Sequence, residues 1–196
     1  MSLKEVITKL SELGKQAKTI RENLAKEIES NKQKYAPEYC HEVNEKVKAE
    51  VNSKLERLKA DAQNLVDKEI ALCYSELDAS YFKNITPEQF AELEMISKSD
   101  VTILEMKKYY EKFSDNYAIL RRLEKIAIDK GYRVLGRSYL ADIEQVEELE
   151  RAFPHFINAI HSGDAMRLLT SESLVNNAVE EYTMYMDKLV EIVSGQ

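Results

Sequence analysis

Apolar residues recur every three or four positions through two long stretches at the start of the chain. The first stretch consists of Leu3, Val6, Leu10, Leu13, Ala17, Ile20, Leu24 and Ile28. The second consists of Val43, Val47, Val51, Leu55, Leu58, Ala62 and Leu65. This spacing places each set along one face of an α-helix. Because an apolar helix face needs a partner surface, both stretches predict long helices that pack against other helices.

The segment Tyr35-Ala36-Pro37 separates the two predicted helices, which extend over residues 3–35 and 37–81. Proline lacks a backbone donor, disfavours the helical conformation at the residue before it, and is common in a first helical turn. The chain can therefore reverse here as a hairpin or continue as a kinked rod. We expect the hairpin, because reversal lets the two apolar faces cover each other. The second helix would be roughly 65 Å long, which predicts an arm that projects from any compact globule.

The remainder of the chain predicts several shorter helices. Thr86-Pro87-Glu88-Gln89 reads as a capping box that starts one of them. An apolar stripe from Ile103 to Leu120 predicts a single helix over about 101–130, closed by Gly131. Residues 132–136 are the one candidate for extended structure. A helix should follow Ser138 and kink or restart at Pro154, and Ser171 or Ser173 should cap the last helix.

These elements predict an all-α fold, in which a long antiparallel helical hairpin resembling a coiled coil is followed by a smaller helical bundle. We expect the hairpin arm to occupy residues 1–83. The bundle, with acidic C-terminal helices, should occupy residues 84–196. With 5 glycines and 3 prolines in 196 residues, the composition also argues against a protein of many turns and short strands.

Charge is distributed unevenly. The net charge is −7, and residues 138–196 carry 11 acidic and 3 basic side chains, so the rest of the chain is nearly neutral. The acidic region is expected to be a solvated helix face, and the alternative is a docking surface for a basic partner. Cys40 and Cys73 stand far apart without a CxxC motif, so we expect two free thiols in a reducing compartment. We expect no transmembrane helix and no signal peptide.

No set of residues indicates catalysis. A carboxylate-bridged metal pair needs two Glu-x-x-His motifs, and the sequence holds one, from Glu38 to His41. The histidines His155 and His161 lack the matching glutamate. No Gly-rich phosphate loop and no nucleophile turn is present. We therefore expect a protein that is not an enzyme, with no catalytic, cofactor-binding or metal-binding residues and no cofactor.

Six basic and two acidic residues lie between positions 121 and 137, in a cluster that contains Arg121, Arg122, Lys125, Arg133 and Arg137. The favoured interpretation is a basic helix end that neutralises a helix dipole and pairs with the acidic helices. Nucleic-acid binding is a less favoured alternative, because the whole chain is acidic. A dock for another protein is the third.

The helical stripes are therefore the main indication of function. A two-helix hairpin covers one side of each helix, so a third element or a second copy of the chain should cover the other. We expect the interaction residues to be those of the second stripe together with the basic cluster, namely Val43, Val47, Val51, Leu55, Leu58, Leu65, Arg121, Arg122, Lys125, Arg133 and Arg137. The protein is expected to form a homo-oligomer or to bind a protein lattice, without a membrane.

The segment Tyr35-Ala36-Pro37-Glu38-Tyr39 between two Lys/Glu-rich helices resembles the helical-hairpin structural proteins encoded by phages and prophages of low-GC Gram-positive bacteria. Residues 116–127 also resemble segments of these proteins, and the resemblance covers mainly the first 130 residues. It implies a role in virion assembly, as an auxiliary or inner capsid component or a scaffold, and a location in the virion or the host cytoplasm. It assigns no catalytic residues. The alternative is an acidic helical inhibitor or regulatory module that docks on a host enzyme or defence complex.

Overall fold

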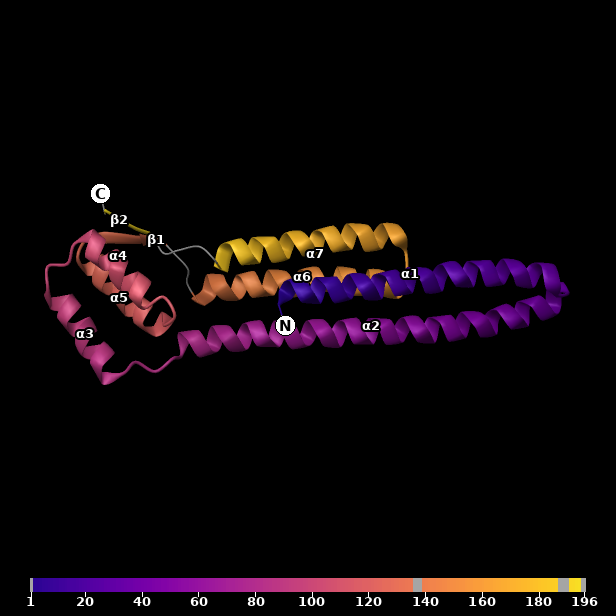
Figure 1. The fold of residues 1–196 in the computed structure, drawn as a ribbon, viewed down its shortest axis with the longest axis horizontal. Coiled ribbons are helices and arrows are strands. Elements are labelled where there is room, and N and C mark those ends of the chain that lie inside the picture. The colour runs from indigo at the N-terminus through magenta and orange to yellow at the C-terminus, as the bar shows by residue number, and fades with distance from the viewer. Residues whose placement is uncertain (1, 136–138, 187–190, 195–196) are drawn as a thin grey trace. The chain divides into compact units, whose positions relative to one another are not determined.

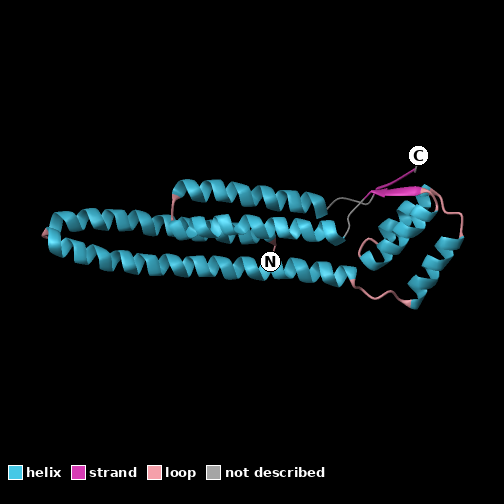
Figure 2. Cartoon of the chain, turned by 180° about the vertical axis from the view of Figure 1, so that it is seen from behind, coloured by secondary structure: helices cyan, strands magenta, loops and turns pink. Residues whose placement is uncertain are grey.

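The computed structural model describes residues 2–135, 139–186 and 191–194. These residues form seven helices and two short strands, which confirms the all-α prediction. The elements are α1 (Leu3–Lys34), α2 (Pro37–Tyr81), α3 (Pro87–Lys98), α4 (Ile103–Lys112), α5 (Tyr117–Asp129), β1 (Tyr132–Leu135), α6 (Tyr139–Ser162), α7 (Ala165–Met186) and β2 (Glu191–Ser194). Figure 1 shows their arrangement, and Figure 2 gives the reverse view.

The first two helices form the predicted hairpin, because α2 runs back along α1 after the break at Tyr35 and Ala36 (Figure 1). Ser2 starts α1 through a capping box with Glu5. Near the tip, the buried side chains of Asn31 and Asn44 meet across the hairpin, with a 2.9 Å hydrogen bond from Nδ2 of Asn31 to Oδ1 of Asn44. This bond pairs one position of α1 with one position of α2, as a buried asparagine does in a coiled coil.

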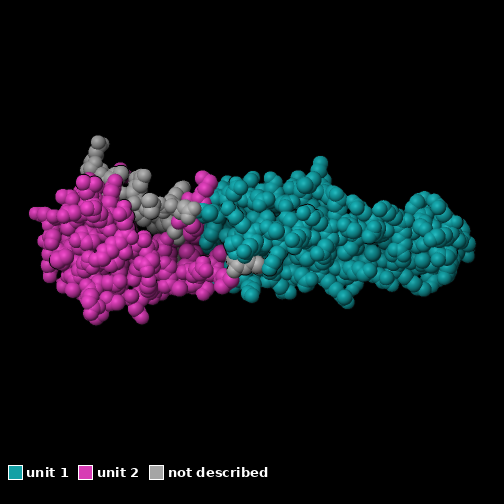
Figure 3. Space-filling model, viewed as in Figure 1, with its two compact units in different colours: residues 1–71, 146–183 teal, residues 72–145, 184–196 magenta. Residues whose placement is uncertain are grey.

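The chain divides into two compact units, which Figure 3 colours separately. Unit 1 comprises residues 1–71 and 146–183, and unit 2 comprises residues 72–145 and 184–196. The long helix α2 contributes residues to both units, and α6 does so too. This division differs from the predicted boundary at residues 83 and 84, since most of α6 and α7 belongs with the hairpin and not with α3–α5.

In unit 1, the hairpin of α6 and α7 packs against the first half of α1. At Gly163, in the turn between α6 and α7, an added Cβ atom would lie 2.9 Å from the carbonyl oxygen of Ala17 in α1. Arg21 donates a 2.9 Å hydrogen bond from Nε to the carbonyl of Ser162. On the α2 side, Nε2 of His161 lies 2.8 Å from Oε1 of Glu56. The same turn is therefore tied to both helices of the long hairpin.

In unit 2, α3, α4 and α5 enclose a separate hydrophobic core, whose fully buried members are Ile96, Met106, Ile119, Leu123 and Ala127. Thr86 and Thr102 cap α3 and α4 through capping boxes. The end of α2 joins this unit at Tyr81, whose ring stacks on Tyr117 with centroids 4.3 Å apart. The Tyr81 hydroxyl also donates a 2.9 Å hydrogen bond to the buried carboxylate of Asp142 near the start of α6.

Several sequence predictions need correction. The single helix expected over 101–130 is two helices, because the chain turns at residues 113–116 and Asn116 caps α5 by accepting a hydrogen bond from the backbone of Ile119. The chain in α6 remains helical through Pro154, so the restart expected as one alternative does not occur, and the other alternative, a kink, stays a prediction. The last helix begins at Ala165, where Asp164 accepts a hydrogen bond from the backbone N–H of Arg167, and not at Ser171 or Ser173.

The extended segment expected after Gly131 is β1, which pairs antiparallel with β2 from the end of the chain. Gly131 itself has the positive φ of +81° that its predicted role in ending a helix requires. The sequence analysis did not foresee β2. The pairing aligns Tyr132 with Ser194 and Leu135 with Glu191, and α5 contacts β1 while α4 contacts β2.

Candidate functional site

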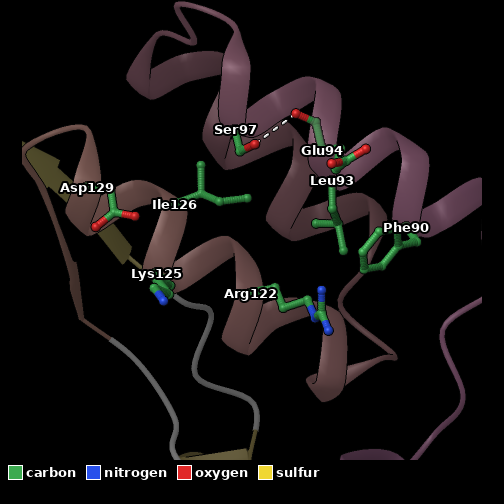
Figure 4. Close-up of a pocket in the computed structure, with 8 residues that line it drawn as sticks. All are labelled: Phe90, Leu93, Glu94, Ser97, Arg122, Lys125, Ile126 and Asp129. Atoms are coloured by element: carbon green, nitrogen blue, oxygen red, sulfur yellow. Dashed lines mark hydrogen bonds between the residues drawn. The ribbon is translucent and has the colours of Figure 1, made fainter.

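A shallow groove between α3 and α5 in unit 2 contains two of the residues predicted to take part in interactions. Its cavity has a volume of about 250 Å³. The lining, drawn in Figure 4, consists of Phe90, Leu93, Glu94, Ser97, Arg122, Lys125, Ile126 and Asp129. Leu93 belongs to the core, whereas Phe90 remains 43% exposed. The groove therefore combines apolar side chains from both helices with charged ones.

The C-terminal ends of α3 and α5 are held together by direct bonds. The amine of Lys130 donates hydrogen bonds to the backbone carbonyls of Ser97 (3.3 Å) and Ser99. The hydroxyl of Tyr132 donates a 2.8 Å bond to the carbonyl of Val101. The last carbonyls of a helix lack partners within the helix, so Lys130 stabilises the end of α3. The interpretation from the sequence placed the cation at the end of its own helix, whereas the amine of Lys130 lies at the end of α3. The pairing of the cluster with the acidic helices stays a prediction.

The charges of the groove nearly balance. The guanidinium of Arg122 lies 5.0 Å from the centroid of the Phe90 ring, in the geometry of a cation–π contact. Lys125 lies one turn further along α5, and the structure shows no ion pair for it among the described residues. The lining also contains Glu94, which forms an ion pair with Lys98 at 3.5 Å, and Asp129. A balanced groove offers no strong attraction for a polyanion.

The structure brings only part of the predicted basic cluster together. Arg121, Arg122 and Lys125 are exposed on α5, and Arg122 and Lys125 line the groove. Arg133 is exposed on β1, opposite Val193. Arg137 lies outside the described residues. The role of the cluster in binding stays a prediction.

The predicted stripe of α2 lies partly in the core. Val51 and Leu55 are buried, whereas Val43, Val47, Leu58 and Leu65 are half-buried. The deepest positions instead follow an 11-residue repeat, as in Cys40, Val51, Ala62 and Cys73, or Asn44, Leu55, Val66 and Leu77. Eleven residues correspond to about 3.67 per turn, close to the 3.6 of a straight helix. Steps of three and four residues do not reveal this repeat, so Leu65 was predicted at a position where the neighbouring Val66 is the buried residue.

The described residues offer no metal-binding cluster: no group of three or more His, Cys, Asp or Glu side chains among them has suitable proximity. In the Glu38–His41 motif, Glu38 and His41 are exposed while Cys40 is buried and accepts a hydrogen bond from Nδ2 of Asn44 at 3.3 Å. None of the described helices is both long enough and apolar enough to cross a membrane.

A second concave site, which the sequence analysis missed, lies in unit 1 between α1 and α7. Its lining is formed by Ser11, Gly14, Lys15, Lys18, Phe156, Ala165, Leu168, Leu169 and Glu172, around a volume of about 220 Å³. The one signal in the sequence was Gly14, a glycine in the middle of a helix, which costs about 1 kcal/mol relative to alanine. A Cβ atom on Gly14 would lie 3.0 Å from Cδ2 of Leu168, so this side chain of α7 packs directly over the glycine.

Comparison with known proteins identifies no relative: the chain matches no family model, no curated protein and no solved structure.

Proposed function

We propose that this chain is a non-enzymatic assembly protein that binds copies of itself or other structural proteins through exposed helix faces. The resemblance noted above extends the proposal to a phage-type structural role, as an auxiliary or inner capsid component or a scaffold. No catalytic chemistry enters this proposal. The expected work of the protein is to hold other protein chains in place.

The proposal is supported mainly by the outer part of the hairpin in unit 1, where α6 and α7 do not cover α1 and α2 (Figure 1). The contacts of the α6–α7 turn reach α1 at Ala17 and Arg21 and α2 at Glu56. Beyond these points α1 and α2 continue as a two-helix segment, as Figures 1 and 2 show. Val43 and Val47 remain half-buried in this segment. A seam covered on one side only is suited to receive a further helix.

The tip of the same segment presents aromatic side chains. Tyr35 is 40% exposed and Tyr39 is 56% exposed, and their rings meet edge to face with centroids 5.2 Å apart. The two tyrosines flank Pro37: the backbone N–H of Tyr35 donates a hydrogen bond to the carbonyl of Asn31 at the end of α1, and Tyr39 lies in the first turn of α2. Tyrosine is enriched among the residues that dominate protein interfaces, because it offers a large rigid surface with a polar end.

The proposal is tested by mass photometry of the full chain, alone and mixed with the products of the genes that neighbour its own. We expect complexes with several copies, and genes for portal, protease and major capsid proteins nearby. Tyr39→Ala should weaken the complexes, whereas the matched exposed substitution Lys48→Ala should not. A chain that stays monomeric and binds none of these products would contradict the proposal.

A second candidate function is an acidic module that docks on a basic site of a host enzyme or defence complex. It is supported by the exposed carboxylates of Glu148 and Glu150 on α6 in unit 1. Stoichiometry separates the two functions, because an inhibitor binds one target in a fixed ratio while an assembly protein is multivalent. Isolation of a complex with one copy of each protein would favour the inhibitor.

A further inference from the structure

The cations on the exposed side of α5 in unit 2 lack the partners that several lysines on other helices have. Lysines of α1, α2 and α3 pair with glutamates three or four positions away along their own helix, as Lys18 does with Glu22 at 3.8 Å. Arg121, Arg122 and Lys125 are all exposed, and none of them forms an ion pair with a described residue. These charges are therefore available to carboxylates of another molecule.

The groove between α3 and α5 beside these cations has an uneven distribution of charge. Figure 4 shows Arg122 next to the exposed ring of Phe90, whereas Asp129 borders the opposite end of the groove. The charge of Glu94 is offset by its ion pair with Lys98 at 3.5 Å. A short acidic segment is therefore attracted to the Phe90 end of the groove and repelled at the Asp129 end.

The exposed side of α7 in unit 1 offers a segment of this kind. Leu174 is 45% exposed, and Asn177, Glu180 and Glu181 are exposed as well. Leu174 and Glu181 are seven positions apart, which is close to two turns, so they lie on the same side of the helix. Residues 168–186 include no lysine or arginine, and neither Glu180 nor Glu181 forms an ion pair with a described residue. This side of α7 therefore combines an apolar side chain with two unpaired carboxylates.

The neighbouring helix α6 adds negative charge at the same end of the α6–α7 pair. The two helices lie side by side and run in opposite directions from the turn at Gly163 (Figures 1 and 2). Glu148 on α6 and Glu180 on α7 are at similar separations from Gly163 along the chain, so they lie at similar heights along the pair. Glu148 is exposed, and it forms no ion pair with a described residue. The acidic charge is thus concentrated at one end of unit 1.

Two complementary surfaces follow from these observations. The acidic α7 face consists of Leu174, Asn177, Glu180 and Glu181, and the basic groove consists of Phe90, Ile126, Arg122 and Lys125. We propose that the acidic α7 face of one copy binds the basic groove of a second copy. The two carboxylates meet the guanidinium and the amine of α5, and the leucine meets the apolar floor of the groove, as when an amphipathic helix enters a groove. The second copy is the occupant because the chain itself presents both halves of the contact, each with unpaired charges.

The two surfaces differ, so the contact is head-to-tail. Each added copy brings a further groove and a further α7 face, and copies therefore continue to add as a ring or an open filament. The proposal rests on the proposed function and agrees with its multivalent assembly. Single exposed ion pairs contribute little, so the contact is weak, and salt weakens it further by screening.

The test is sedimentation velocity of the full chain from submicromolar to tens of micromolar concentration at low salt. The unmodified chain should form species larger than dimers as its concentration rises, and high salt should reverse their formation. The groove variant, Arg122→Glu with Lys125→Glu, and the helix variant, Glu180→Lys with Glu181→Lys, should each associate at least about tenfold more weakly. Like charges then face each other across the contact.

Mixing the two variants provides the decisive measurement. The groove variant has an acidic groove and an acidic α7 face, and the helix variant has a basic groove and a basic α7 face. Each surface of one variant is therefore complementary to a surface of the other, so the mixture should assemble although neither variant does so alone. A variant that was merely misfolded would not be rescued by mixing. The matched control is Lys107→Glu with Lys108→Glu on exposed positions of α4, which changes the net charge as the groove variant does and should assemble normally.

An unmodified chain that stays monomeric at all these concentrations would overturn the proposal. Variants that assemble alone as the unmodified chain does, or a mixture that stays monomeric, would overturn it too. A contact within one chain would respond to salt without any dependence on concentration, and this result would also overturn it. None of these outcomes removes the proposed function while the chain still binds the products of neighbouring genes. Failure of that function appears as the absence of those complexes.

Discussion

Replacement of Gly163 by alanine should destabilise unit 1 through two separate effects. Gly163 has a φ of +63°, a conformation that disfavours any residue with a Cβ atom. The new methyl group would also lie 2.4 Å from Cγ of Arg21 and 2.9 Å from the carbonyl oxygen of Ala17. The arginine side chain can move away, but the carbonyl is part of α1 and cannot move without shifting that helix.

The size of the effect follows from these two contributions. A non-glycine residue in the left-handed region costs about 1–2 kcal/mol. Forcing an extra methyl group into a packed contact costs about 1–3 kcal/mol more. Displacement of Arg21 would also disturb its hydrogen bond to Ser162. We therefore expect a loss of about 2–5 kcal/mol in unit 1, out of a typical total stability of about 5–15 kcal/mol.

The chain provides a matched control at Gly131. Its φ of +81° carries the same backbone cost, but no atom lies within 4 Å of the Cβ position. Gly131→Ala should therefore cost only about 1–2 kcal/mol. Because the two glycines lie in different units, hydrogen exchange should be followed by mass spectrometry on peptides from each unit, which reports local opening free energies separately.

The comparison of the two variants tests whether the added methyl group at position 163 presses against α1. We expect faster exchange throughout α6 and α7 in the Gly163 variant, with a larger loss of opening free energy than Gly131→Ala produces in unit 2. Equal losses in the two variants would show that the turn does not press against α1. A Gly163 variant as stable as the unmodified chain would refute both contributions.

Three further predictions concern packing, a buried polar pair and a helix cap. Leu55→Ala changes a fully buried position and should lower the free energy of unfolding, measured by urea denaturation, by about 2–5 kcal/mol. Leu65→Ala should lower it by less, because Leu65 is only half-buried. Asn31→Ala leaves Asn44 without its donor and should cost about 1–3 kcal/mol. Replacing both asparagines by leucine should recover stability relative to the Asn31→Ala variant. A double variant no more stable than Asn31→Ala would contradict this explanation. Hydrogen bonds from Thr102 lower the pKa of the Glu105 carboxylate from its usual 4.5. The cap therefore stabilises α4 fully above pH 4.5, and this stabilisation is lost as the pH falls through the lowered pKa of the folded state. A titration midpoint of Glu105 at or above 4.5 in NMR spectra would refute this prediction.

Local signals in the sequence, namely the apolar repeat and the capping residues, were enough to predict several of the helices. The spacing of apolar residues predicted the existence of α1 and α2, because a long helix face leaves a regular pattern in the chain. The Thr86 capping box predicted the start of α3 in the same way. Pro37 marked the turn of the hairpin, and the structure resolved the choice between a turn and a kink. These features depend on residues within a few positions of one another.

Features that depend on distant contacts were decided by the tertiary structure. The end of α4 and the start of α5 fall inside one continuous apolar stripe, and only the turn capped by Asn116 separates them. The close contact of the α6–α7 turn with α1 depends on the absence of a side chain at Gly163, which is far in sequence from Ala17. The strand β2 forms because β1 lies where it can pair with it.

The candidate sites show the same contrast between local and distant information. Arg122 and Lys125 could be identified from their spacing, but their position opposite Phe90 depends on how α3 packs against α5. The concave site between α1 and α7 combines residues as far apart in the chain as Ser11 and Glu172, which are separated by 161 positions. Periodicity within one helix shows which face needs burial. It does not show which other helix covers that face or which part stays exposed, because that choice is made by side-chain shape and contact across the whole unit.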